Sequence, residues 1–312
     1  MQKQQSKNGL TRKKLMDYGF VASLLVIPIV QFLIFWVYIN FDSILMAFEH
    51  PATGEWTLAN FERLFQSWNS GIGMDMGESV LNTVYYFLFN NFVMLTLSIV
   101  FSYLLFKKVF LHGMFRVIFF LPNIINQVVM CTLFIYLMEA GGPVMTLIES
   151  LGIHLDPEVV RNGPLATEST AWGMILLYML WSGFGMNIVL QTGALGRIPE
   201  DIFEYARIDG VGMVREFAQI VVPLIWPTIT TLFVFGLAGI FNMSGPVLLL
   251  TEGEYGTSTI GYYILHEILL VSKGTGNLNY PAAVGLFFTV IGVPLVLGTK
   301  ALLDRIGQTV EY

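Results

Sequence analysis

Six long apolar runs alternate with polar stretches along the chain, at 18–40, 84–106, 117–138, 171–192, 224–250 and 282–303. About 20 apolar residues in a helix cross the roughly 30 Å of hydrocarbon in a bilayer, so each run predicts one transmembrane helix. Gly236, Gly239 and Pro246 interrupt the fifth run and predict that its end is bent or unwound. The pattern as a whole predicts an all-α membrane protein with six spans.

A polar stretch at 199–223 separates the fourth and fifth runs and predicts two short helices with a sharp break between them. Pro199 suits the first turn of a helix, and the acidic residues behind it suit the positive end of the helix dipole. Asp209 and Gly210 form a turn signal, and Asp209 can cap the second helix. Pro223 closes the stretch. The apolar positions at helical spacing are Ile202, Phe203 and Ala206, followed by Val214, Phe217, Ala218 and Val221.

Composition supports the membrane assignment. Of the 312 residues, 55% are hydrophobic and only 12% are charged, and the mean hydropathy is +0.67. Soluble domains carry about 25% charged residues. The single cysteine, Cys131, excludes an internal disulfide and any metal site built from several cysteines. His266-Glu267 lacks the second histidine of a zinc-binding helix, so we predict neither a metal site nor a cofactor.

Lysine and arginine are sorted by side of the membrane. The two termini, the loop between spans two and three and the loop between spans four and five hold all but three of the 16 basic residues. The exceptions are Arg63, Arg161 and Lys273. Because basic residues collect on the cytoplasmic side, we predict that both termini and the stretch 199–223 are cytoplasmic. The outer loops then lie near 41–83, 139–170 and 251–281. The first contains an aromatic pattern that predicts a short amphipathic helix, at Trp56, Phe61, Leu64, Phe65 and Trp68.

The stretch 199–223 resembles the EAA motif of type I ABC importer permeases, the binding-protein-dependent inner-membrane components. Tyr205 departs from the pattern, because it stands where the family has an alanine. The positions that match the family are Glu204, Ala206, Asp209, Gly210, Phe217, Ile220 and Pro223.

Further segments extend the resemblance over about residues 78–303 and point to the sugar-permease subfamily. Asn82-Thr83 is similar to the family's entry to its shared core, and Trp181, Gly183, Gly185 and Asn187 are similar to the subfamily's fourth span. The remaining matches are Phe115-Arg116, Phe119-Phe120-Leu121-Pro122, Leu250-Thr251, Gly253, Gly256 and Ser258-Thr259. The subunit most resembles the larger, first-encoded sugar permease.

The resemblance implies a division of the chain. A cytoplasmic segment at 1–17 precedes the first transmembrane helix at 18–40 and an outer loop at 41–77. The transmembrane core occupies 78–303, and a cytoplasmic tail occupies 304–312.

The resemblance also implies a mechanism and a set of partners. The two short helices at 199–223 dock into a dimeric cytoplasmic ATP-binding subunit, and an external solute-binding protein delivers the substrate. A second, different permease completes the pathway in the cell (inner) membrane, in contact with membrane lipid and with no role for nucleic acid. The chain contains no Gly-x-x-x-x-Gly-Lys-Ser/Thr loop, so it is not the ATP-binding subunit, and we expect no enzymatic activity.

Two sets of residues are candidates for function. Glu204 is the first choice for a charged contact with the ATPase, and the alternative is an ordinary ion pair with Arg207 on its own helix. Trp181, Ser182, Asn187 and Asn242 are candidates for the carbohydrate pathway, because they flank the motif and offer the amide, hydroxyl and aromatic groups that a sugar needs. The alternative for such polar residues is hydrogen bonding between helices, as for Asn90, Asn91, Asn123, Asn126, Gln127, Gln191 and Ser244.

Three other functions remain open. The same machinery could carry another solute, such as an amino acid, phosphate or glycerol phosphate, although no basic residue lies within a span to attract a phosphate. An ion-coupled secondary carrier is less favoured, because no carboxylate lies deep within a span. A membrane scaffold without transport activity is the third alternative.

Overall fold

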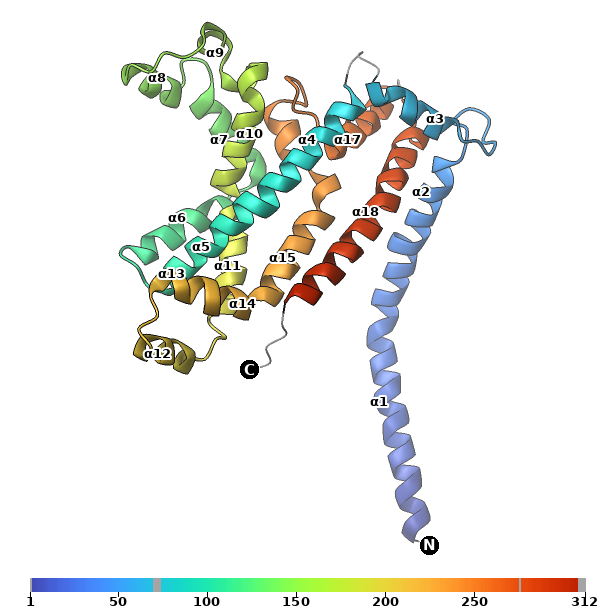
Figure 1. Cartoon of the computed structure of the whole chain (residues 1–312). Coiled ribbons are helices and arrows are strands. Elements are labelled where there is room, and N and C mark those ends of the chain that lie inside the picture. The colour runs from blue at the N-terminus through green and yellow to red at the C-terminus, as the bar shows by residue number, and fades with distance from the viewer. Residues whose placement is uncertain (1, 70–73, 275, 308–312) are drawn as a thin grey trace. The chain divides into compact units, whose positions relative to one another are not determined.

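Helices account for nearly all of the regular structure in the computed structural model, which describes residues 2–69, 74–274 and 276–307 (Figure 1). The chain divides into two units. One comprises the residues up to 64 together with 277–286, and the other comprises 65–276 together with the residues from 287 onward. Of the predicted segments, 70–73 in the outer loop and 308–312 in the tail lie outside the described residues.

The first unit is built on one long helix, apolar from residue 17 onward, and a short helix attached to its C-terminal end. The long helix consists of α1 (Gln2–Phe32), a π-helical segment (Leu33–Tyr38) and α2 (Ile39–Ala47). The predicted amphipathic helix is confirmed as α3 (Ala59–Gln66). The buried Asn60 amide donates to the carbonyl oxygens of Ala47 at 3.1 Å and Glu49 at 3.0 Å. This fastens α3 to the end of α2.

The second unit holds the remaining spans and the loops at their ends. Its elements on the N-terminal side are α4 (Met76–Leu88), a π-helical segment (Phe89–Met94), α5 (Leu95–Phe106), α6 (His112–Ile124), α7 (Gln127–Met138), α8 (Pro143–Ser150), α9 (Pro157–Asn162), α10 (Glu168–Ser182) and α11 (Phe184–Leu195). The following elements are α12 (Glu200–Ile208), α13 (Met213–Glu216), a π-helical segment (Phe217–Val221), α14 (Val222–Leu224), α15 (Trp226–Ala238), α16 (Gly245–Leu250), α17 (Ile260–Ser272) and α18 (Asn279–Ile306), of which α18 begins in the first unit.

Length and composition identify the membrane-crossing helices among the described residues. Five are long and apolar enough to span a bilayer, and a sixth is counted if a helix pair bent by 72° is one span. The five are 17–47, 76–106, 127–150, 168–195 and 279–306, and the bent pair joins 213–224 to 226–238. The prediction of an all-α membrane protein with six spans is therefore confirmed, with the fifth span strongly bent.

Two of the predicted spans are interrupted in the structure, one unexpectedly and one as predicted. The run at 117–138 is not one helix, because α6 ends at Ile124 and the side chain of Asn126 accepts the backbone N–H of Val128 at 2.8 Å to start α7. Such a cap offers the backbone an alternative to a continuous helix. The predicted interruption of the fifth run is confirmed: Gly239 ends α15, and Pro246 lies in the first turn of α16.

Glycines allow close helix packing in the second unit. A side chain at Gly185 would overlap the Asn123 side chain and the Phe119 carbonyl oxygen on α6, and one at Gly236 would overlap Asn91. The fourth-span glycines singled out in the sequence therefore have a packing role, which is common where membrane helices approach closely.

Candidate functional site

The stretch 199–223 folds as the two predicted short helices, α12 and α13. Figure 1 shows α12 at one end of the second unit and α8 and α9 at the other. Pro199 stands just before the first residue of α12, and Phe203 and Ala206 are buried on its inner side. Gly210 ends the helix with a φ of +70°, a conformation that glycine adopts without strain. The turn predicted at this glycine is therefore present.

One predicted cap is wrong. Asp209 does not cap the second helix, because it is the C-terminal cap of α12, and its backbone N–H donates to the carbonyl oxygen of Tyr205. The residue preceding α13 is Gly212, which has no side chain to offer. The loop is closed instead by the Val211 N–H, which donates to the Ala206 carbonyl oxygen at 2.9 Å. A backbone hydrogen bond thus closes the break between the two helices.

The outer face of this segment carries exposed apolar side chains beside Glu204. Tyr205 is 68% exposed, Ile208 is 80% exposed and Val214 is 82% exposed. Because Tyr205 faces outward, its replacement of the family's alanine requires no repacking. Glu204 is exposed, and among the described residues it forms no ion pair with Arg207. Its charge is therefore available to a partner.

A buried ion pair fastens the segment to the end of α5. Glu216 is only 4% exposed, and its carboxylate lies 2.5 Å from the Lys107 ammonium. The Tyr103 hydroxyl donates to the same carboxylate oxygen at 2.9 Å. The Lys107 ammonium also lies 4.8 Å from the centre of the Phe203 ring, within range of a cation–π contact. Both short helices are thus attached to one lysine, which the sequence indicated only as a cytoplasmic charge.

The C-terminal part of the motif shapes the bend into the next span. Phe217 packs against Tyr103 with ring centres 5.1 Å apart and the ring planes tilted by 46°, and Ile220 is half-buried. Pro223 lies two residues after the π-helical segment 217–221. Because proline has no N–H and its ring crowds the preceding turn, a widened turn of this kind relieves the clash. The 72° change of direction follows at Ile225.

Hydrogen bonds between two motifs far apart in the sequence organise the opposite end of the unit. The Asn82 amide on α4 donates to the carbonyl oxygens of Gly256 at 2.8 Å and Ser258 at 2.9 Å. The Ile260 N–H donates to the Thr83 hydroxyl at 2.9 Å. Asn82, Thr83, Ser258 and Ile260 are buried, and Gly256 is half-buried. The loop preceding α17 is therefore held to the first turns of α4.

The loop at 251–257 needs its glycines. Gly253 has a φ of +71°, and a side chain there would overlap the ring of Tyr262. Glu252 and Tyr255 also have positive φ values, of 53° and 56°. Left-handed backbone costs a residue with a side chain about 1–2 kcal/mol, so the surrounding contacts must compensate for this geometry.

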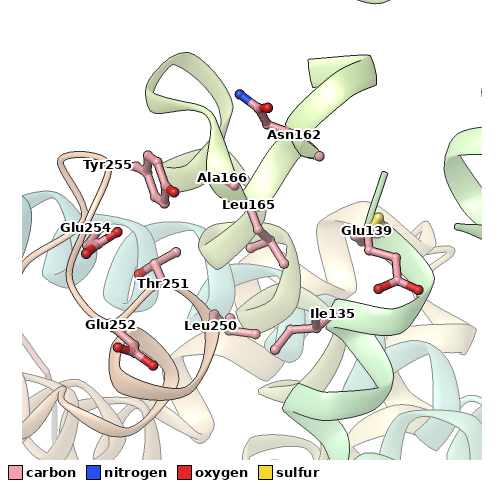
Figure 2. Close-up of a pocket in the computed structure, with 12 residues that line it drawn as sticks. Ile135, Glu139, Asn162, Leu165, Ala166, Leu250, Thr251, Glu252, Glu254 and Tyr255 are labelled. Atoms are coloured by element: carbon pink, nitrogen blue, oxygen red, sulfur yellow. The ribbon is translucent and has the colours of Figure 1, made fainter. Parts of the chain in front are cut away.

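A cavity of about 290 Å³ lies beside this loop. Figure 2 shows Glu252, Glu254 and Tyr255 from the loop on one side and Ile135 and Glu139 from α7 on the other. Three carboxylates make the cavity rich in hydrogen-bond acceptors. Among the described residues, no group of three or more His, Cys, Asp and Glu side chains is arranged to hold a metal ion.

The four predicted pathway residues lie on three elements, with Trp181 and Ser182 both at the end of α10. None of them lines the cavity beside the loop 251–257. Trp181 is 38% exposed and packs near Phe134, with ring centres 6.1 Å apart. Ser182 and Asn187 are half-buried on α10 and α11, and Asn242 is exposed between α15 and α16. Their role in the pathway stays a prediction.

Several other polar residues within the spans bond to neighbouring helices. The Gln191 amide on α11 donates to Ser98 at 3.0 Å and accepts from Ser102 at 2.9 Å, and all three are fully buried. The Asn91 amide donates to the Phe233 carbonyl oxygen at 3.2 Å. The Asn123 amide donates to the Ser182 carbonyl oxygen at 3.0 Å. These residues therefore form hydrogen bonds between helices, which was the alternative to a role in the carbohydrate pathway.

Comparison with known proteins identifies relatives of this architecture. Residues 12–312 match the family described as binding-protein-dependent transport system inner membrane component. The chain is 27% identical to the lactose transport system permease protein LacF of Rhizobium radiobacter, over 71% of this chain and 72% of the relative. It is 25% identical to the arabinooligosaccharides transport system permease protein AraP of Halalkalibacterium halodurans, over 90% of this chain and 89% of the relative.

A solved structure shares the fold. It is a bacterial ABC transporter involved in the import of the acidic polysaccharide alginate, matched with a TM-score of 0.81 at 21% identity over 95% of this chain and 99% of that chain. The same transporter, in complex with an alginate pentasaccharide-bound periplasmic protein, matches equally well. The similarity confirms the type I importer permease fold predicted from the sequence.

Proposed function

The chain belongs to the family of binding-protein-dependent transport system inner membrane components, and we propose that it is one permease subunit of an ATP-driven importer for a sugar or oligosaccharide. The carbohydrate class is supported by relatives whose names specify lactose and arabinooligosaccharides. The subunit forms half of the translocation pathway, and a second, different permease supplies the other half. A separate subunit hydrolyses ATP.

The observation that carries the coupling proposal is the exposed face of α12. Tyr205 and Ile208 are large apolar side chains that stand in water beside the charge of Glu204. Exposed apolar groups rimmed by charge are typical of protein–protein contact sites. The proposed partner is a groove on the cytoplasmic ATP-binding subunit dimer, with a basic residue opposite Glu204. This requires the segment 199–223 and both chain termini to be cytoplasmic, as the distribution of lysine and arginine predicts.

The attachment of the segment supports transmission of force into the membrane. A docking element that is loosely tethered would move without moving the spans. Here Glu216, Lys107 and Tyr103 join α13 to the end of α5 through an ion pair and a hydrogen bond. Movement of the short helices by the ATPase would therefore displace the helix 76–106.

The opposite end of the second unit is the proposed receiving surface for an external solute-binding protein. Helices α8 and α9 and the loop 251–257 lie there, away from α12 (Figure 1). The structurally similar alginate transporter is known in complex with a periplasmic protein. Sugar would then enter at this end and pass residues such as Trp181 and Asn187.

Trp181 provides the test of the pathway. Replacing Trp181 with alanine removes an aromatic face on which a sugar ring can stack. We expect a rise of about two- to twelve-fold in the substrate concentration for half-maximal uptake, since aromatic contacts contribute about 0.5–1.5 kcal/mol. Trp36→Ala is the control, because Trp36 is 60% exposed on the first long helix. Equal effects of the two substitutions would assign Trp181 to packing alone.

Reconstitution tests the function as a whole. The chain is purified with its co-purifying subunits, inserted into vesicles, and assayed for uptake of labelled oligosaccharides with ATP and a binding protein. We expect uptake that requires ATP and does not change when the ion gradients are dissipated. Uptake that collapses with the ion gradient and persists without ATP would identify a secondary carrier. ATP-driven uptake of amino acids or glycerol phosphate, but of no sugar, would support the proposed importer and contradict the proposed carbohydrate substrate.

A further inference from the structure

A basic cavity lies where α5 and α11 end, beside the coupling segment. It has a volume of about 800 Å³ and is lined by the end of α5 and by residues 196–207. Four cationic side chains line it, Lys107, Lys108, Arg197 and Arg207, against the single carboxylate of Glu200. We propose that this cavity binds the phosphate-bearing headgroup of an anionic phospholipid. The site is additional to the transport function and does not depend on it.

The cavity keeps an excess of positive charge after the ion pair between Lys107 and Glu216 is taken into account. Lys107 is neutralised by Glu216. Lys108, Arg197 and Arg207 are exposed side chains, and in the described part of the chain none of them forms an ion pair. Three cations thus face one carboxylate. Guanidinium and ammonium groups brought together in a concave site favour a phosphate, which accepts several charge-assisted hydrogen bonds at once.

The position of the cavity along the membrane normal favours a lipid. Two membrane-crossing helices, 76–106 and 168–195, end one residue before Lys107 and two residues before Arg197, respectively. The hydrocarbon layer gives way to headgroups at the ends of such helices, so the cations lie at the depth of lipid phosphates. This argument holds whichever side of the membrane the site occupies.

Apolar groups in and beside the cavity suit the glycerol and upper acyl region of a lipid. Phe106, Ile198 and Phe203 line it together with the cations. Phe110, on the turn that follows Lys108, is 86% exposed, and aromatic side chains of this kind are enriched at membrane interfaces. A free phosphate ion would interact with the basic side chains alone, whereas a phospholipid would contact both the basic side chains and the apolar lining.

Binding here would join two parts of the transporter. Lys108 belongs to the turn after α5, whereas Arg207 belongs to the last turn of α12. One headgroup held between them would steady α12 against the end of the transmembrane helix. The lipid would act beside the buried Lys107–Glu216 pair and reinforce the same attachment.

The experiment measures retained lipid on the full-length chain, purified with its co-purifying subunits and exposed to equal amounts of phosphatidylglycerol and phosphatidylcholine in mixed micelles. Native mass spectrometry counts the bound lipids. The test variant combines Lys108→Gln with Arg197→Gln. The control combines Arg116→Gln with Arg215→Gln, which removes the same charge from exposed residues that do not line the cavity.

We expect the unmodified chain to retain phosphatidylglycerol in preference to phosphatidylcholine. The test variant should lose about 25-fold in that preference, about five-fold for each basic residue that contacts the headgroup. The control should change by less than about two-fold, because its charges do not line the cavity and salt screens their attraction at longer range. Equal losses in the two variants, or undiminished retention in the test variant, would overturn the proposal.

A second arm distinguishes a lipid from a free phosphate. Water-soluble glycerol 3-phosphate carries the same charged group without acyl chains, and inorganic phosphate carries the charge alone. We expect neither to displace phosphatidylglycerol at equal concentration. Displacement by either would show that the cavity recognises a soluble phosphate, and the lipid assignment would fail.

Discussion

The Lys107–Glu216 pair gives the sharpest test of how the coupling segment is held, because its two members are buried to different extents. The Glu216 side chain is 5% exposed, whereas that of Lys107 is 27% exposed. Removing Lys107 leaves a buried carboxylate whose remaining partner, among the residues that the structure describes, is the Tyr103 hydroxyl. Removing the charge of Glu216 leaves an ammonium that can reach water. The two substitutions should therefore differ in cost.

The magnitudes follow from this asymmetry. Breaking a buried ion pair and leaving the charge behind costs about 3–5 kcal/mol, and the remaining hydrogen bond from Tyr103 brings Lys107→Met to the lower end, about 3 kcal/mol. Glu216→Gln should cost about 1 kcal/mol, as for an ordinary hydrogen bond. The double variant removes both charges and should be less destabilised than Lys107→Met alone, because residues in one network are not additive.

Limited proteolysis measures the local opening directly. Arg207 and Arg215 are trypsin sites within the segment, and when opening is fast compared with cleavage, the cleavage rate follows the open population. We expect cleavage to rise about 150-fold in Lys107→Met and about five-fold in Glu216→Gln, with partial recovery in the double variant. The buried Cys131, the sole cysteine, serves as the control, because its reaction with a maleimide reports unfolding of the bundle. Equal effects of the single substitutions, or strictly additive effects in the double variant, would refute the reasoning.

Three further substitutions test other parts of the molecule. Glu204→Lys should leave the chain in the membrane and its Cys131 unreactive, but abolish substrate-stimulated ATP hydrolysis in the reconstituted complex; normal uptake would contradict the docking role. Gly253→Ala should destabilise the fold by about 2–4 kcal/mol through positive φ and overlap with Tyr262, measured by thermal unfolding. Gly152→Ala is its control, because Gly152 has a φ of +76° but no atom close enough to overlap a new side chain. It should cost only the strain of the left-handed backbone, about 1–2 kcal/mol. Asn82→Leu should cost about 2–3 kcal/mol, because it strands two carbonyl oxygens, and an unchanged midpoint of unfolding would be the contrary result.

The distribution of apolar and polar residues predicted most of the fold. Each apolar run overlaps a membrane-crossing helix, although the run 117–138 corresponds to a helix at 127–150. The polar stretch 199–223 was identified as two helices with a break at Gly210. The break at Asn126 was not predicted, because the run 117–138 is apolar on both sides of it. A cap depends on whether one side-chain oxygen reaches a backbone N–H, and hydrophobic periodicity does not contain that information.

Long-range pairings could not be predicted from the sequence. Asn82 and the loop around Ser258 were each singled out as motifs, but nothing in the pattern indicated that one binds the other. Glu216 is similar in this respect. In the sequence it is one more charge in a polar stretch, and its burial depends on Lys107 from a different loop. Local patterns determine the elements, whereas the partners of polar side chains depend on how the elements assemble.

The two ends of the helix 76–106 are attached by different chemistry, and this difference bears on how movement would travel. At the end that contains Asn82, neutral hydrogen bonds to backbone carbonyls hold the loop before α17. At the end that contains Lys107, an ion pair holds the coupling segment. Neutral bonds to backbone are directional and fix a loop in place, whereas a charge pair tolerates sliding over several tenths of an ångström because Coulomb energy falls slowly with distance.

A π-helical segment at 89–94 lies between these ends, and within it the Asn91 side chain donates to the carbonyl oxygen of Phe233 on α15. Widened turns of this kind bend more readily than regular helix. The helix 76–106 is thus bonded to other segments at both ends, and its middle is hydrogen-bonded to α15, which follows the coupling segment. We infer that displacement of α13 would turn the half of this helix next to Lys107 about the π-helical segment, while the loop held by Asn82 stays in place.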